Sequence, residues 1–98
     1  MTRRLLLSAL ASTLLLAGTA GAADAPAGAS SCTGCHAAQA MPDSAIPRIA
    51  GRPAAELVRF LHDYRSNALS SSVMGRIARG FDDAQIDAIA AWFAAQPQ

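Results

Sequence analysis

One short motif constrains the fold of this chain more than any other feature: the five residues Cys32-Thr33-Gly34-Cys35-His36. Two thiols three positions apart, followed at once by an imidazole, are the groups that a covalently attached porphyrin requires. Each cysteine can add to one vinyl group, because about one helical turn separates the two sulfurs. His36 can then reach the iron from the same face as its proximal ligand. Since Cys32 and Cys35 are the only cysteines, the motif predicts one covalent haem c.

Two other interpretations of the motif fit less well. A thioredoxin-type redox site needs a βαβ context, and the sequence has no β-strand alternation. A zinc site would have to combine Cys32, Cys35 and His36 with His62, and two adjacent ligands with one remote one are a poor spacing for zinc. Haem c is therefore the preferred interpretation.

Residues 1–22 have the pattern of an export signal. A basic start (Thr2-Arg3-Arg4) precedes an apolar run from Leu5 to Leu16, and Ala20-Gly21-Ala22 supplies the small residues that a signal peptidase reads. The apolar run is shorter than the roughly 20 residues that span a bilayer, so a retained helix is the less favoured alternative. We therefore expect a periplasmic domain over residues 23–98, with no stable membrane anchor after cleavage.

The charge of the expected mature chain is close to zero. The sequence has eight arginines, no lysine and seven acidic residues, and loss of Arg3 and Arg4 leaves six arginines against seven acids, a formal charge of −1. No basic stripe is present, so no nucleic-acid partner is expected. There is also no nucleophile–base pair, and Asp82-Asp83 fits a helix start better than paired catalytic carboxylates. Alone, the chain is not expected to catalyse more than electron exchange.

A domain of about 76 residues is marginal for an unaided core, and small domains usually need a staple. A buried porphyrin would give the surrounding helices a large apolar body to pack on. The local patterns predict an all-α domain, in which a short helix runs from Pro26 into Cys32. A proline-containing loop then covers residues 37–52.

Three further helical segments are predicted beyond this loop. Pro53 opens a helix that ends near Ser66-Asn67, and residues 73–79 form a short helical turn. Asp82 caps the last helix, with Gln85 completing a capping box. The expected buried faces are Leu57, Phe60, Leu61 and Tyr64 in the first of these helices and Ile86, Ile89, Ala90 and Phe93 in the last.

The sixth iron ligand decides the function, because an iron with two protein ligands mainly transfers electrons. Met41 lies so soon after His36 that the chain would have to turn round the porphyrin edge at once, and His62 has charged neighbours on its helix. Met74 follows a helix and a serine-rich loop, which is enough chain to reach the opposite face. We expect Met74 to be the ligand, although a lone methionine is more usually a core residue.

Two kinds of supporting contact are expected around the iron. A ligating histidine usually donates its second ring N–H to a carbonyl or a carboxylate, and the carbonyl of Pro47 is the candidate acceptor for His36. Arg52 or Arg76 is a candidate partner for a haem propionate, with a solvated surface position as the alternative for either side chain.

With these residues in order, residues 23–98 resemble the class I c-type cytochromes. The resemblance rests on an amino-terminal helix into CxxCH, a proline loop, a middle helix, a methionine and a carboxy-terminal helix. It implies a small all-α fold around one haem, in which the first and last helices cross near Trp92. It also places Pro47 and Met74 where this family has its histidine-orienting carbonyl and its axial thioether.

A narrower resemblance lies in residues 71–81, Ser-Ser-Val-Met-Gly-Arg-Ile-Ala-Arg-Gly-Phe, and the helix after them. This segment is similar to the cytochrome subunit of flavocytochrome c sulfide dehydrogenase, which accepts electrons from an FAD-containing subunit. The resemblance implies a haem subunit of a sulfide-oxidising complex. Two alternatives stay open: an independent soluble carrier between respiratory or photosynthetic complexes, and a ligand-binding haem sensor.

Overall fold

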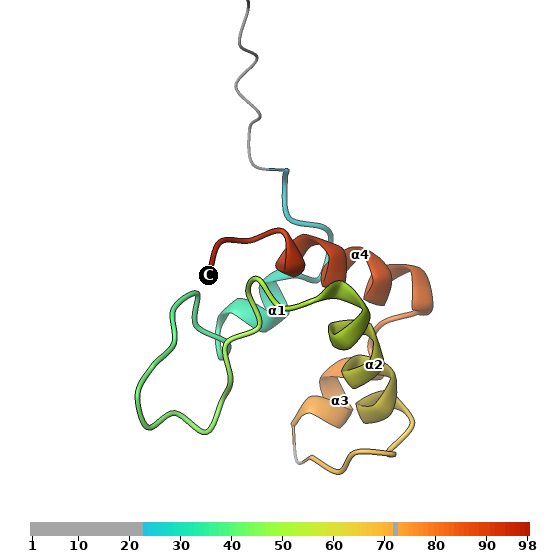
Figure 1. The fold of residues 1–98 in the computed structure, drawn as a ribbon. Helices are drawn as coiled ribbons and strands as arrows, with labels where there is room; N and C mark the ends of the chain where they lie inside the picture. The colour runs from blue at the N-terminus through green and yellow to red at the C-terminus, as the bar shows by residue number, and fades with distance from the viewer. Residues whose placement is uncertain (1–22, 72) are drawn as a thin grey trace, which may run out of the picture.

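The computed structural model describes residues 23–71 and 73–98, which form four helices in chain order: α1 (Ser30–Thr33), α2 (Ala54–Arg65), α3 (Met74–Ala78) and α4 (Asp83–Ala94) (Figure 1). These residues contain no β-strand, so the predicted all-α class is confirmed. None of their helices has the length and apolar character needed to cross a membrane. The export signal expected over residues 1–22 lies outside the described residues and stays a prediction.

The two long helices begin and end at the signals that the sequence carries. Pro53 precedes α2 with φ −55° and ψ 132°, and Asn67, just past its end, takes the left-handed conformation with φ 64°. At the start of α4, the Asp82 carboxylate accepts the Gln85 backbone N–H at 2.8 Å, and the Gln85 side-chain oxygen accepts the Asp82 N–H at 2.9 Å. The predicted capping box is therefore confirmed.

The first helix is shorter than the sequence analysis expected. The Ala29 N–H donates to the carbonyl of Pro26 at 3.1 Å in a turn, and the helix itself starts only at Ser30. The reason is Gly28, whose φ of +91° is incompatible with a right-handed helix. The helix can therefore not extend back to Pro26, and only one turn leads into Cys32.

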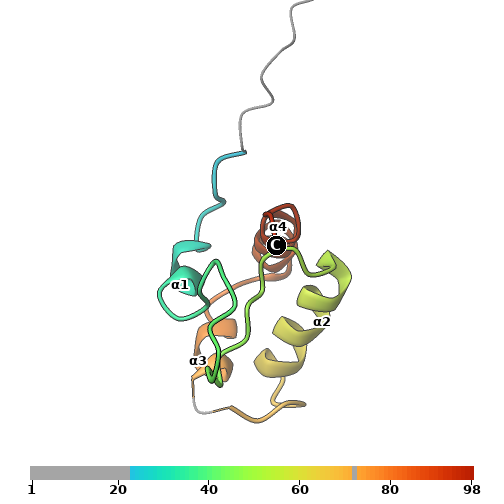
Figure 2. The same ribbon diagram turned by 60° about the vertical axis from the view of Figure 1, so that its left-hand side comes forward.

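α1 and α2 both pack against α4, which Figure 2 shows nearly end-on above them. The buried cluster that joins the three helices contains side chains from each: Ala29, Cys32, Leu57, Ile89, Ala90 and Phe93. Four partly buried residues pack around it: Ile49, Val58, Phe81 and Trp92. The first and last helices thus meet through small residues on the α1 side, and the apolar bulk comes from α4.

Three hydrogen bonds attach the loop before α2 and the segment before α1 to the carboxy-terminal part of the chain. The Gly51 N–H donates to the Phe93 carbonyl at 2.9 Å, and the Gln98 side-chain amide donates to the Gly51 carbonyl at 2.8 Å. The Trp92 indole N–H donates to the Ala23 carbonyl at 2.9 Å. As a result, the loop before α2 and the segment before α1 are both attached to the last turns of α4.

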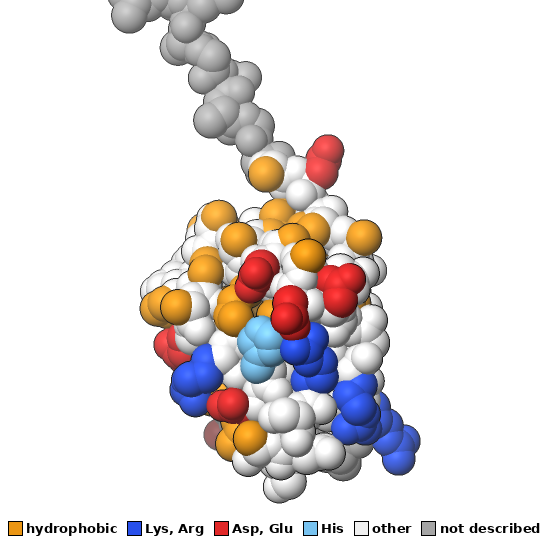
Figure 3. All heavy atoms as spheres, turned by 90° about the vertical axis from the view of Figure 1, so that its right-hand side faces the viewer, with side chains coloured by type: hydrophobic (Ala, Val, Ile, Leu, Met, Phe, Trp, Pro, Cys, Tyr) orange, Lys and Arg blue, Asp and Glu red, His pale blue; other side chains and the backbone are white. Residues whose placement is uncertain are grey.

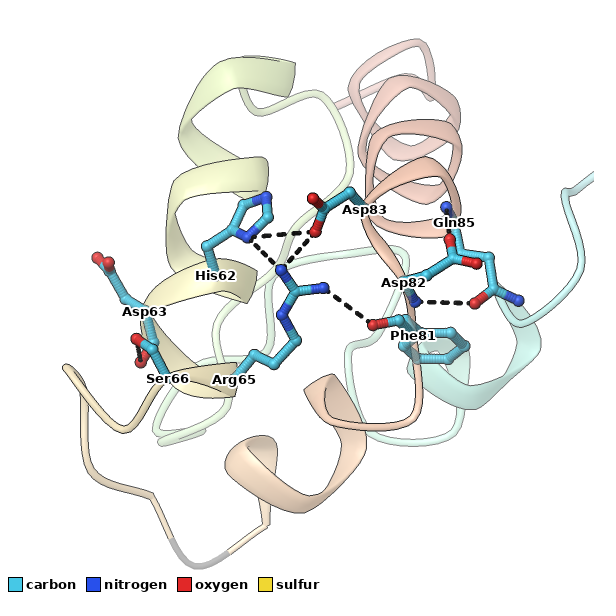
Figure 4. Close-up of polar contacts among 8 residues, drawn as sticks. All are labelled: His62, Asp63, Arg65, Ser66, Phe81, Asp82, Asp83 and Gln85. Carbon is cyan, nitrogen blue, oxygen red and sulfur yellow. Dashed lines mark hydrogen bonds and ion pairs between the residues drawn. The ribbon is translucent and has the colours of Figure 1, made fainter.

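A polar network on the surface joins the end of α2 to the start of α4 (Figure 4). Arg65 donates to the Phe81 carbonyl at 3.1 Å and forms an ion pair with Asp83, and it also donates to His62 Nδ1 at 2.9 Å. The hydrogen bond that the Asp83 carboxylate accepts from the Arg65 guanidinium holds the pKa of Asp83 below its usual range. Acidic and basic side chains gather with a histidine on the face drawn in Figure 3.

Replacement of Gly28 tests the close packing of the amino-terminal segment. A Cβ at this position would lie 2.5 Å from Phe81 Cε1 and would sit on a backbone with φ +91°. We expect Gly28→Ala to lower the free energy of unfolding by about 1–3 kcal/mol. Gly34→Ala is the matched control, because nothing lies within 4 Å of its Cβ; it should change stability by less than about 0.5 kcal/mol in urea unfolding. Equal effects would contradict the account.

The Arg65–Asp83 ion pair predicts a pH dependence of stability. Because the folded pKa of Asp83 is lowered, its stabilising contribution is present above the unfolded pKa and is lost as the pH falls through the folded one. The free-energy difference between the wild type and Asp83→Asn should therefore shrink as the pH falls from about 5 to below about 4. Urea unfolding at each pH measures it, and a pH-independent difference would show that the charge of Asp83 is unimportant.

Candidate functional site

One cavity of about 520 Å³ lies among α1, α2, α3, α4 and the loop before α2. Its walls carry Cys32, Cys35, His36 and Met74, the four residues that the sequence analysis assigned to cofactor attachment and iron ligation. The structure therefore brings together side chains that lie as far apart in the chain as positions 32 and 74. Their roles toward a cofactor stay a prediction.

The CxxCH motif forms the end of α1 and the turn after it. The backbone N–H groups of Cys35 and His36 both donate to the Cys32 carbonyl, at 3.2 and 2.9 Å. This single turn presents both sulfurs and the imidazole to the same cavity. Cys32 is buried, and this burial raises the pKa of its thiol, whereas Cys35 is exposed.

A hydrogen bond to the backbone orients the imidazole of His36. Its Nδ1 lies 2.6 Å from the Pro47 carbonyl oxygen. A carbonyl can only accept, so the proton of the neutral ring is on Nδ1 and the lone pair of Nε2 is free to bind a metal. These are the two groups that the sequence analysis paired, and their arrangement is the one typical of a metal-ligating histidine.

Met74 is the first residue of α3, at the part of the cavity wall that the chain reaches after α2. Its backbone N–H donates to the Ser71 hydroxyl at 2.9 Å. Ser71 also lines the cavity, and the sequence analysis did not identify it. A serine hydroxyl commonly accepts backbone N–H groups two or three residues further along the chain, so the spacing of Ser71 and Met74 was an available signal.

The other two candidate iron ligands lie elsewhere. Met41 is 63% exposed and is not part of the cavity wall. His62 is on the outer side of α2, where its Nδ1 lies 2.9 Å from Arg65 and 3.9 Å from Asp83 (Figure 4). Of the methionine and histidine side chains that the structure describes, the cavity is lined by His36 and Met74.

The two arginines considered as propionate partners differ in their placement. Arg52 lines the cavity, forms an ion pair with Glu56 and lies 5.3 Å from the centre of the Phe60 ring. Arg76 is exposed and is not part of the cavity wall. Among the described residues, Arg52 is therefore the better placed of the two to meet a carboxylate in this cavity.

Most of the remaining wall is apolar and fits a porphyrin. The predicted apolar face of α2 is only partly buried by protein: Leu57 is 6% exposed, while Phe60, Leu61 and Tyr64 are intermediate, and all four line the cavity. Among the described residues on the wall, none is Asp or Glu. The volume lies within the roughly 300–1,000 Å³ of cofactor sites. An apolar cavity with two thiols, an oriented imidazole and a thioether matches haem c.

Three known proteins are similar in sequence to this chain. The chain is 36% identical over 63 residues to the cytochrome subunit of sulfide dehydrogenase of Chlorobaculum tepidum. The matched residues make up 64% of this chain and 57% of that protein. It is 41% identical over 71 residues to the thiosulfate dehydrogenase electron acceptor of Stutzerimonas stutzeri, a match over 70% of this chain and 33% of that protein. It is 36% identical over 93 residues to the protein of the same name from Thiomonas intermedia, covering 93% and 43%.

No family model matches the chain. The chain spans 57% of the length of the first relative and less than half of the other two. The helical fold and these similarities together support a cytochrome c, with the haem cofactor which that implies, and the chain resembles the cytochrome subunit of sulfide dehydrogenase.

Proposed function

We propose that this chain is a periplasmic monohaem cytochrome c that transfers single electrons, with His36 and Met74 as axial ligands of the iron. The observation that carries the proposal is the common cavity of Cys32, Cys35, His36 and Met74. Haem, when bound, supplies a reversible one-electron couple between ferric and ferrous iron. The residues of this chain would supply the rest of the function by holding the haem and its iron in a fixed position.

Each of the four residues has a separate role in this proposal. The thiols of Cys32 and Cys35 hold the ring through two thioether bonds and are not iron ligands. His36 binds iron through Nε2, and its hydrogen bond to Pro47 fixes the ring plane and raises the basicity of the ligand. Met74 supplies a soft, neutral donor that favours ferrous iron and so raises the reduction potential.

The apolar wall supports electron transfer rather than ligand sensing. Side chains of α2 and α4, including Leu57, Phe60 and Phe93, line the cavity and give it a largely apolar wall. Two protein ligands leave no free coordination position for a small molecule. The sensor alternative requires Met74 to be labile, and the ferrous protein would then bind carbon monoxide readily at neutral pH.

We further propose that the electron donor is a dehydrogenase that oxidises a reduced sulfur compound. The support is the similarity to a sulfide dehydrogenase subunit and to thiosulfate dehydrogenase electron acceptors. In the first form of the proposal, the chain is the haem subunit bound to an FAD-containing flavoprotein. Other redox proteins would then accept the electron.

The second form is an independent carrier that diffuses between a dehydrogenase and its acceptors. It is favoured by the names of two relatives, which describe an electron acceptor and not a subunit. Purification of the chain from its native periplasm distinguishes the two forms. A flavoprotein that co-purifies in a fixed ratio supports the subunit, and a monomeric haem protein supports the carrier.

Substitution of Met74 tests the axial ligand. We expect Met74→Ala to lower the reduction potential by on the order of 100 mV, a small part of the roughly 0.8 V that axial ligands span, and to open the iron to carbon monoxide. Met41→Ala is the matched control, since Met41 is 63% exposed and lies off the cavity wall. Potentiometric titration measures both variants. An unchanged potential in Met74→Ala would remove Met74 from the iron.

Denaturation in acidified acetone tests the covalent attachment. The expected result is that the colour stays with the polypeptide and that its mass exceeds that of residues 23–98 by one haem. Cys32→Ser and Cys35→Ser should each give a lower yield of haem protein, because each variant loses one of the two thioether bonds. Colour that is extracted into the solvent from the wild type would refute the cytochrome c proposal as a whole.

A further inference from the structure

The methionine at the start of α3 is held by a hydrogen bond from its own backbone. The Ser71 hydroxyl accepts the N–H of Met74 at 2.9 Å and that of Val73 at 3.3 Å. The first N–H groups of a helix have no partner within the helix, and a serine hydroxyl is one of the side-chain groups that satisfy them. One hydroxyl thus accepts two N–H groups at the residue proposed to bind iron.

Burial does little to hold Ser71, Val73 and Met74, which lie before the first buried residue of α3, Gly75. Val73 is 54% exposed, Ser71 is exposed, and Met74 faces the cavity and not a packed core. A helix of five residues is also too short to be stable by itself. The position of the Met74 backbone therefore depends on the few hydrogen bonds that its neighbours make.

The rest of α3 is fixed separately, from its second residue, Gly75, to the residue after its last, Arg79. Arg79 donates to the Asn67 side-chain oxygen at 3.3 Å, and Gly75 is buried beside the Tyr64 carbonyl, which would lie 3.5 Å from an added Cβ. These contacts attach the body of α3 to the end of α2. They leave the orientation of the first residue, Met74, to the segment that precedes it.

We propose that Ser71 is a positioning residue for Met74: its hydroxyl fixes the backbone from which the thioether reaches the iron. The inference rests on the proposed ligation by Met74 and names the group that makes that ligation strong. Without the hydroxyl, residues 73 and 74 lose a shared acceptor at the cavity wall. The methionine then dissociates more readily, and an external ligand replaces it at a lower concentration.

Imidazole binding to the ferric holoprotein tests the proposal, because imidazole must displace the methionine. We expect Ser71→Ala to raise the apparent affinity about two- to thirtyfold, the range that corresponds to the loss of a serine hydroxyl that accepts helix N–H groups. Ser71→Thr, which keeps a hydroxyl, should return the affinity to within about twofold of the wild type. Ser70→Ala is the matched control: Ser70 is exposed, and among the described contacts its hydroxyl makes no hydrogen bond.

The free energy of unfolding is measured for the same variants to separate positioning from general stability. If Ser71→Ala lowers stability but leaves the imidazole affinity unchanged, Ser71 only stabilises the fold and the proposal is wrong. The same conclusion follows if Ser70→Ala raises the affinity equally. Failure of the underlying function is recognised separately with Met74→Ala: if that variant binds imidazole no more tightly than the wild type, Met74 is not the ligand.

Discussion

The arrangement of this protein depends on apolar faces that the protein itself does not fully cover. α2 and α4 pack against each other around Leu57, Ala90 and Phe93, but the same faces continue onto the wall of one cavity. Removal of apolar side chains from water lowers the free energy of the folded state. An apolar body that fills the cavity would therefore stabilise the fold. A domain of this size thus gains a core from its cofactor in addition to its own side chains.

Two parts of the cavity wall are organised by local hydrogen bonds. In the first, a single turn of α1 leads into the CxxCH motif, and the Pro47 carbonyl orients His36 at 2.6 Å. In the second, the Ser71 hydroxyl accepts the N–H of Met74 at 2.9 Å. Each candidate ligand is therefore held by one hydrogen-bond acceptor that lies within a loop. In the chain, α2 lies between the two ligands.

Much of the fold could be predicted from the sequence, because its signals are local. The proline before α2, the capping box of α4 and the apolar spacing along both helices act within a few residues of where they stand. The length of α1 was predicted wrongly, since the backbone of Gly28 adopts φ +91° against Phe81, a contact between distant segments. The Arg65–Asp83 pair likewise depends on how α2 and α4 meet, which no local pattern specifies.

The candidate site could be predicted from the sequence to the extent that chemistry limits the choice of residues. Only two thiols exist, and the adjacent imidazole leaves little freedom for their role. The choice among Met41, His62 and Met74 was harder, because spacing gives reach but not direction. In the structure, Met41 is exposed to solvent, His62 is bound to Arg65 and Met74 lies on the cavity wall, which supports Met74 as the proposed ligand. If His36 and Met74 hold the iron as proposed, both protein ligands stay bound in the two oxidation states, and little rearrangement is needed when the iron changes its charge. That is the property that fast electron exchange requires.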